Sequence, residues 1–182
     1  MRVSSLALSS VMATVLLSLA ACSPAPSSSA SPESPSTESP ETPQAEATPA
    51  EFQFDAITLD GQPFDGTSIY GTPTILWFWA EWCPNCRAEA PFIADALDEL
   101  PAGVQVIGVP GHSSQEGMEA FVAAQDLEGI VHLVDADGGL WSLFGVASQP
   151  AIAVISADGT IRVVSGSVGK TGFLELAESI AD

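Results

Sequence analysis

Two cysteines, Cys83 and Cys86, are the residues of this 182-residue chain best suited to chemistry. Pro84 and Asn85 separate them, and good helix formers follow at once. Two thiols at this spacing can close a small disulfide ring. The free N–H groups of a first helical turn favour the thiolate form of the first cysteine, Cys83. Pro84 suits that turn because its missing N–H costs nothing there. The spacing predicts thiol–disulfide exchange, with Cys83 as the exposed attacking thiol and Cys86 as the buried resolving thiol.

Other uses of a Cys-x-x-Cys pair fit the rest of the chain less well. Half of a zinc site has the same spacing, but the chain has no second such pair, and His112 and His132 stand far apart in the sequence. An inert disulfide would close so short a loop that little chain entropy is gained. We therefore expect no metal and no cofactor.

The cysteines follow an apolar run that has to position them. Residues 74–80 are apolar on both faces, as a covered parallel strand requires, and residues 84–100 have apolar positions at helical spacing. Pro91 should interrupt that helix and kink it. The other expected elements are an edge strand at 52–58, a turn and return strand at 59–64, strands at 104–109 and 131–134, a helix from Ser113 or Ser114 to 126, a short helix at 140–144, a hairpin of 151–156 and 160–165, and a last helix capped by Thr171. Their order predicts an α/β fold with a mixed sheet and helices on both faces.

The stretch Phe78–Cys86, FWAEWCPNC, resembles the F-W-A-x-W-C-x-x-C signature of the thioredoxin superfamily. A longer pattern, with WCPNCRAEAP at Trp82–Pro91, DADG at 135–138 and QP at Gln149–Pro150, resembles the secreted and lipid-anchored DsbE/DsbF-like group of the TlpA-type thioredoxins. The resemblance implies a thioredoxin-like three-layer α/β/α domain with a mixed central sheet and an N-terminal β-hairpin extension. It also implies an extracytoplasmic thiol:disulfide oxidoreductase.

The same resemblance implies roles for single residues. Trp82, Pro84 and Asn85 would belong to the active-site motif. Pro150 would follow a cis peptide bond and pack against the cysteines, which leaves the backbone of Gln149 free to pair with an extended substrate segment. Relatives more often have Thr or Val before this proline, so their substrate preferences do not transfer to this chain.

Four residues bear on the direction of exchange. Trp77 stands where thioredoxin-type reductases usually keep a buried Asp that moves the proton of the second cysteine. Its presence argues against a reductase unless another acid, such as Glu89, moves the Cys86 proton. Asn85 and Arg87 would each favour a thiolate and so raise oxidising power. We therefore expect an oxidase that forms disulfides in exported proteins.

Two alternatives remain open. A reductase could supply reduced apocytochrome cysteines for cytochrome c maturation, and a redox potential of about −270 mV or below, instead of about −120 mV, would identify it. A copper-binding carrier of the same fold is more remote, because such carriers pair Cys-x-x-x-Cys with a distant His. Metal titration of the reduced protein would decide that question. Peroxidase chemistry is disfavoured, since no cysteine here follows a Thr/Ser-x-x pattern.

The N-terminal region predicts export and anchoring. Residues 1–21 have a basic start and a short apolar core, as a signal peptide does. The sequence before Cys22, Leu-Ala-Ala, resembles the bacterial lipobox, which implies cleavage there and a diacylglycerol on the Cys22 thiol. Residues 22–50 are rich in Ser, Pro and Glu and predict a disordered, lipid-anchored linker. The thioredoxin-like domain is then expected at residues 51–182.

The charge of the chain limits its partners. Asp and Glu number 23 against 4 Lys and Arg, for a formal charge of −19, which excludes nucleic-acid binding by a basic surface. We expect exported cysteine-containing proteins as substrates and a membrane redox partner that recycles the protein. Membrane contact is expected only through the lipid anchor, at the outer face of the cell membrane.

Overall fold

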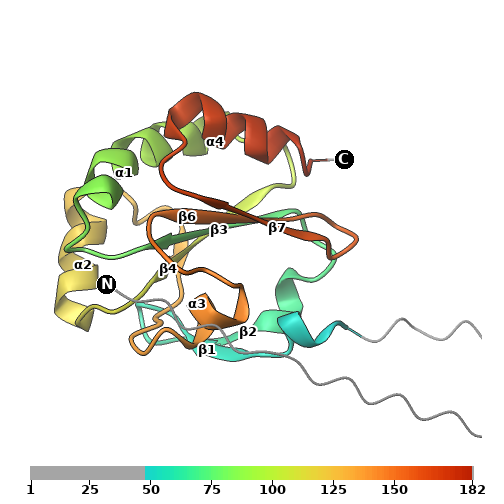
Figure 1. Cartoon of the computed structure of the whole chain (residues 1–182), viewed down its shortest axis with the longest axis horizontal. Helices are drawn as coiled ribbons and strands as arrows, with labels where there is room; N and C mark the ends of the chain where they lie inside the picture. Colours follow the sequence, from blue (N-terminus) through green and yellow to red (C-terminus); the bar gives the residue numbers. More distant parts are fainter. Residues whose placement is uncertain (1–47, 182) are drawn as a thin grey trace, which may run out of the picture. The chain divides into compact units, whose positions relative to one another are not determined.

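The computed structural model describes residues 48–181. The expected signal peptide, Cys22 and nearly all of the expected linker lie outside the described residues. A five-stranded mixed sheet in the order β5-β4-β3-β6-β7 forms the centre of the fold (Figure 1). Its strands are β3 (Thr74–Trp79), β4 (Gln105–Pro110), β5 (Val131–His132), β6 (Ala151–Ile155) and β7 (Ile161–Ser165). β3, β4 and β5 are parallel, whereas β6 and β7 are antiparallel to their neighbours.

Helices cover the two faces of the sheet as the handedness of crossover connections requires. The path β3–α1–β4–α2–β5 moves steadily toward one edge, so right-handed crossovers place α1 (Pro84–Ala96) and α2 (Gln115–Ala124) on the same face. Helix α4 (Gly169–Glu178) joins them there. The chain then returns across the sheet from β5 to β6, and α3 (Gly139–Leu143) packs on the opposite face. The predicted three-layer α/β/α arrangement is confirmed.

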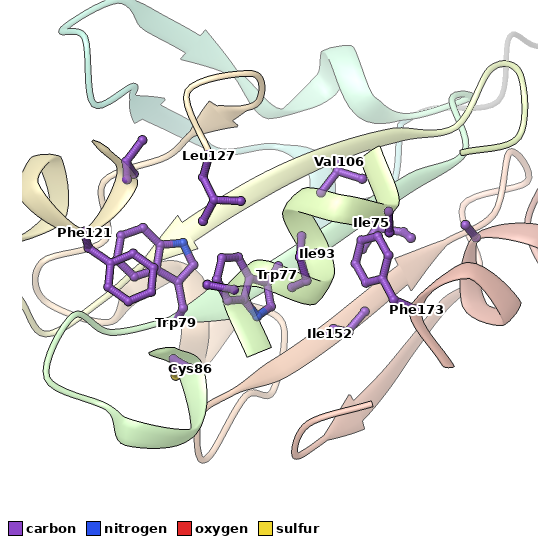
Figure 2. Close-up of a cluster of buried hydrophobic side chains, with 14 of the residues drawn as sticks. Ile75, Trp77, Trp79, Cys86, Ile93, Val106, Phe121, Leu127, Ile152 and Phe173 are labelled. Carbon is purple, nitrogen blue, oxygen red and sulfur yellow. The ribbon is translucent and has the colours of Figure 1, made fainter. Parts of the chain in front are cut away.

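Strand β3 divides the core into two halves. Side chains alternate along a strand, so Ile75, Trp77 and Trp79 enter the core beneath α1, α2 and α4, as Figure 2 shows. Leu76 and Phe78 enter the second core, beneath α3 and the N-terminal segment. Every residue of β3 is buried, which confirms that the strand before the cysteines is covered on both faces.

An N-terminal hairpin covers one edge of the sheet. It consists of β1 (Asp55–Ile57) and β2 (Pro63–Asp65), flanked by 3₁₀ turns at Ala50–Phe52 and Gly66–Ile69. The backbone N–H of Val134 donates to the Ile57 carbonyl at 2.9 Å, beside the edge strand β5. The strand expected at 52–58 is shorter because Phe52 lies in a 3₁₀ turn and buries its ring against Tyr70, with ring centroids 5.3 Å apart.

Two helix expectations were wrong. Pro91 does not break α1, which continues to Ala96 and then into a 3₁₀ turn at Leu97–Glu99, and only the kink expected at Pro91 stays a prediction. Pro91 lies on the exposed side, so the carbonyl that loses its partner can turn to water. Thr171 does not cap α4 either, because the helix already begins at Gly169 with Val168 as its N-cap residue.

No helix within residues 48–181 combines the length and the apolarity that crossing a lipid bilayer requires.

Candidate active site

Cys83 stands at the junction between β3 and α1. Strand β3 ends at Trp79, a turn follows, and Cys83 is the N-cap residue of α1 with extended backbone angles. Its sulfur accepts a hydrogen bond from the backbone N–H of Cys86 at 3.2 Å. Both cysteines are free thiols. The predicted placement of two thiols in the first turn of a helix is confirmed.

The expectation that Cys83 is exposed was wrong. Its exposed fraction is 3%, against 0% for Cys86. The reason is the cap itself, which turns the Cys83 sulfur back toward the helix instead of outward, and both cysteines belong to the core beneath α1. The two thiols therefore differ in their hydrogen bonding rather than in their access to solvent.

The Cys86 thiol is held in its protonated form. Burial above all raises its pKa far above the usual value, and the hydrogen bond with the Cys83 side chain raises it further. The charges of Cys83 and Glu89 act in the same direction. Any step that forms a Cys86 thiolate therefore needs a nearby group that takes up or supplies a proton.

The residues around the cysteines make contacts that differ from those expected. Arg87 donates its Nε–H to the Glu81 carbonyl at 2.7 Å, so it ties down the turn before Cys83. Asn85 is exposed, and within residues 48–181 its side chain makes no hydrogen bond. The hydrogen bond that supports a Cys83 thiolate therefore comes from the backbone of α1.

Trp82 is an exposed aromatic residue next to Cys83 in the sequence. Its exposed fraction is 53%, yet its indole N–H donates to the carbonyl of His112 at 3.0 Å. His112 lies in the loop after β4, in a left-handed conformation with φ of 53°. Its ring packs edge-on against Trp141, with centroids 5.0 Å apart. In the same loop, the Ser113 hydroxyl donates to the Glu81 carboxylate.

Sequence reasoning missed this loop as part of the site. Its residues lie about 30 positions beyond Trp82, and nothing in their local pattern indicates a partner. Only the parallel pairing of β3 with β4 brings the two strand ends together, because the carboxyl ends of parallel strands meet at one edge of a sheet.

Gln149 and Pro150 reach the same end of the sheet from β6. The Gln149–Pro150 bond is cis, as predicted. Ala151 pairs with Phe78 in the antiparallel β3–β6 register, so Pro150 comes level with Trp79, where β3 leads to Cys83. Gln149 is partly buried, and among the described residues its backbone N–H and carbonyl have no backbone partner. The register thus brings both predicted substrate-binding residues to the strand end that carries Cys83.

A buried carboxyl group lies one helical turn beyond Cys86. Glu89 is 1% exposed. Its Oε1 accepts the backbone N–H of Val168 at 2.7 Å, and its Oε2 accepts the indole N–H of Trp77 at 3.2 Å. Burial raises the pKa of Glu89, and these hydrogen bonds oppose the rise. The sequence suggested Glu89 as a substitute acid but not the partners that hold it.

The chain is similar to proteins of known family along most of its folded part. Residues 44–164 match the AhpC/TSA family. The soluble secreted antigen MPT53 of Mycobacterium tuberculosis H37Rv is 40% identical over 129 residues, which cover 71% of this chain and 73% of the relative.

Two solved structures are similar as well. MTB DsbF, in mixed oxidised and reduced forms, superposes with a TM-score of 0.70 at 36% identity, covering 74% of this chain and 99% of the other. A secreted Mycobacterium tuberculosis disulfide oxidoreductase homologous to E. coli DsbE gives a TM-score of 0.66 at 35% identity, with 71% and 97% coverage. These matches agree with the thiol pair at the start of α1 and with the three-layer fold. The chain therefore belongs to the AhpC/TSA family, as a thioredoxin-fold thiol:disulfide oxidoreductase of the DsbE/DsbF-like kind.

Proposed function

We propose that this protein is an oxidase that forms disulfides in exported proteins by exchange with Cys83 and Cys86. The observation that carries the proposal is the hydrogen bond from the Cys86 N–H to the Cys83 sulfur at the start of α1. A donor at this point stabilises the Cys83 thiolate, which belongs to the reduced form of the protein. Stabilising the reduced form raises the redox potential and makes the disulfide a stronger oxidant.

The oxidation proceeds in two displacements. A substrate thiolate attacks the Cys83 sulfur of the disulfide, a mixed disulfide forms, and Cys86 leaves as a thiolate. A second substrate thiolate then attacks the substrate sulfur and displaces Cys83. The substrate loses two electrons and gains a disulfide, while the protein gains two electrons as a dithiol. The backbone N–H of Cys86 that meets the Cys83 sulfur stabilises the charge on this sulfur as it leaves in the second displacement.

Glu89 is the group that handles the Cys86 proton in this scheme. The Cys86 thiolate cannot persist in its buried position, so it takes a proton as it leaves. Glu89 is the carboxyl group one turn further along α1, and burial raises its pKa toward the range in which a carboxyl group can donate. The reverse step, in which Glu89 accepts the proton from Cys86, serves reduction equally well.

The substrate segment is proposed to lie between Trp82 and the Gln149–Pro150 bend. The unpaired backbone groups of Gln149 can hydrogen-bond an extended peptide as an added strand. The exposed indole of Trp82 offers an apolar surface beside the cysteine of that peptide. The acidic surface of the chain favours substrates with neutral or basic residues around the reacting cysteine.

We further propose that the domain acts outside the cytoplasm, attached to the membrane through a lipid on Cys22. The lipobox-like sequence before Cys22 supports the lipid anchor. The relative named as a soluble secreted antigen supports only the location outside the cytoplasm. A membrane redox partner would return the reduced protein to the disulfide form. Incorporation of labelled palmitate that is lost in Cys22→Ser tests the anchor, and no labelling of the wild-type protein would refute it.

A reductase for apocytochrome cysteines is the second candidate, and one observation favours it. A buried carboxyl group next to Cys86 suits a resolving thiol that must lose its proton before it attacks. Equilibration of the Cys83–Cys86 pair with glutathione buffers separates the two candidates. A potential near about −120 mV supports the oxidase, and one at or below about −270 mV overturns it in favour of the reductase.

A further inference from the structure

We propose that Trp77 is a positioning residue for thiol–disulfide exchange: its indole N–H, together with the backbone N–H of Val168, holds the Glu89 carboxylate in one orientation beside Cys86. The proposal rests on the role given above to Glu89. It does not depend on the direction of exchange, because the same carboxyl group donates the proton in oxidation and accepts it in reduction.

The contacts leave the Glu89 carboxylate little freedom. Trp77 Nε1 lies 3.2 Å from Oε2, and the Val168 nitrogen lies 2.7 Å from Oε1. One donor comes from the central strand and the other from the start of α4, so each oxygen has its own partner on a different element. A carboxylate held at both oxygens keeps its place relative to Cys86 through every cycle of exchange.

The position of Trp77 in β3 explains why it can do this. The alternation of the strand turns residue 77 toward α1, and Figure 2 shows its ring in the core between the cysteine end of the helix and Ile93. The indole is fully buried, and a buried indole N–H usually finds an acceptor. The Glu89 carboxylate is that acceptor, and an aromatic ring without an N–H could not replace the contact.

The chain contains its own control for the proposal. Trp79 lies two residues further along the same face of β3, is equally buried, and stacks on Trp77 with ring centroids 5.7 Å apart. Its indole nitrogen, however, has no hydrogen-bond partner among the described residues. Trp77→Phe and Trp79→Phe therefore remove similar volumes from one core, but only the first removes a hydrogen bond from Glu89.

The donor also affects the protonation of Glu89. A hydrogen bond to the ionised form lowers the pKa of a carboxyl group, and the contact from Trp77 opposes the effect of burial in this way. Loss of the donor should therefore move the ionisation of Glu89 to higher pH. Loss of a hydrogen bond from a neutral donor to a charged group should shift the titration midpoint by about one pH unit.

The first measurement follows Glu89 directly. Infrared spectra across a pH titration record the C=O stretch of its protonated carboxyl group, identified as the band that Glu89→Gln lacks. We expect the midpoint of Trp77→Phe to be about one unit higher than that of the wild type, and the midpoint of Trp79→Phe to be unchanged. Equal midpoints in the two tryptophan variants would overturn the proposal.

The second measurement follows the reaction. One equivalent of 5,5′-dithiobis(2-nitrobenzoate) reacts first with reduced Cys83, and the attack of Cys86 on that mixed disulfide releases the second nitrothiobenzoate ion. The rate of this second release should fall at low pH, where Glu89 is protonated and cannot accept the Cys86 proton. We expect this fall to begin at higher pH in Trp77→Phe and at the wild-type pH in Trp79→Phe. Identical pH profiles for the wild type and Trp77→Phe would overturn the proposal.

A third replacement keeps the test decisive if Trp77→Phe does not fold. 3-Benzothienylalanine at position 77 retains the shape of the indole and lacks its N–H, and it should shift both pH curves as Trp77→Phe does. A low redox potential would refute the proposed oxidase and leave the role of Trp77 intact. Unshifted pH curves would refute the role of Trp77 and leave the oxidase intact.

Discussion

Glu89 of helix α1 accepts the backbone N–H of Val168 at 2.7 Å, so a side chain from the active-site helix caps the start of helix α4. The sequence indicated Thr171 for this purpose. A carboxylate suits the start of a helix because free N–H groups and the helix dipole favour negative charge there. One residue thus serves both the packing of α1 on α4 and the proton transfer proposed for Cys86.

The first prediction concerns the pH dependence of stability at Glu89. Its pKa in the folded protein lies above the usual 4.5, so between these values the folded state binds more protons than the unfolded state. The stability that Glu89 contributes should be fully present below pH 4.5 and fall as pH rises through the folded-state pKa. Urea unfolding of the wild type and Glu89→Gln across this range measures it. Glu178→Gln, at an exposed position of α4, should retain the wild-type slope, and a wild-type slope in Glu89→Gln would contradict the prediction.

The second prediction concerns His132, whose effect on stability changes with pH in the opposite direction to that of Glu89. Burial lowers its pKa from the usual 6.5, so below pH 6.5 the unfolded state binds more protons than the folded state. Stability should therefore fall as pH drops below 6.5, and His132→Phe should remove that part of the slope. Thermal unfolding between pH 4.5 and 8 tests this, with His112→Phe at an exposed site as the control. Equal slopes in both variants would refute it.

The third prediction tests whether Cys83 exchanges with the substrate and Cys86 resolves the mixed disulfide. Cys83→Ser should abolish exchange, whereas Cys86→Ser should accumulate mixed disulfides with substrate proteins because the resolving thiol is missing. Non-reducing gels followed by mass spectrometry identify the trapped partners, and the double variant provides the background. Absence of trapped partners from Cys86→Ser cells would count against the exchange mechanism.

The fourth prediction separates docking from chemistry at Trp82. Trp82→Ala removes an exposed indole, so the free energy of unfolding should change by about 1 kcal/mol or less. The KM for a cysteine-containing peptide should rise about five- to tenfold, while the reaction with a small aromatic disulfide should keep its rate. Phe92→Ala removes an exposed aromatic side chain within α1, about 13 Å from Cys83 along the helix axis, and should leave both the peptide KM and the rate with the small disulfide unchanged. Equal effects of the two variants would exclude a docking role for Trp82.

The fifth prediction concerns the start of α3, which packs against β3 from the face opposite α1. The buried Asp135 accepts the N–H groups of Leu140 at 3.0 Å and Trp141 at 2.8 Å. Asp135→Asn replaces one accepting oxygen by a donor, so the free energy of unfolding should fall by about 1 to 3 kcal/mol. Among residues 48–181, the exposed Asp137 accepts only the Gly139 N–H, at 3.2 Å, and Asp137→Asn should cost less stability. Chemical denaturation compares the two, and equal losses would contradict the prediction.

The sequence by itself determined the features that depend on local pattern. The apolar run before Cys83 predicts a covered strand because both faces of such a strand meet other elements, and β3 is buried throughout. Ser114, one of two expected caps, accepts the Gly117 N–H at the start of α2, because a hydroxyl before a helical run satisfies a free donor. The place of Cys83 and Cys86 in the first turn of α1 follows from the same local rules.

Only the tertiary structure decided how distant residues meet around those cysteines. Trp82 binds a carbonyl 30 positions away, and Glu89 binds an N–H 79 positions away. Such contacts depend on which strands pair and on the face to which each crossover turns its helix, and no pattern within one element encodes either. The burial of Cys83 likewise depends on how its sulfur turns at the cap and on the core that α1 and the sheet form around it.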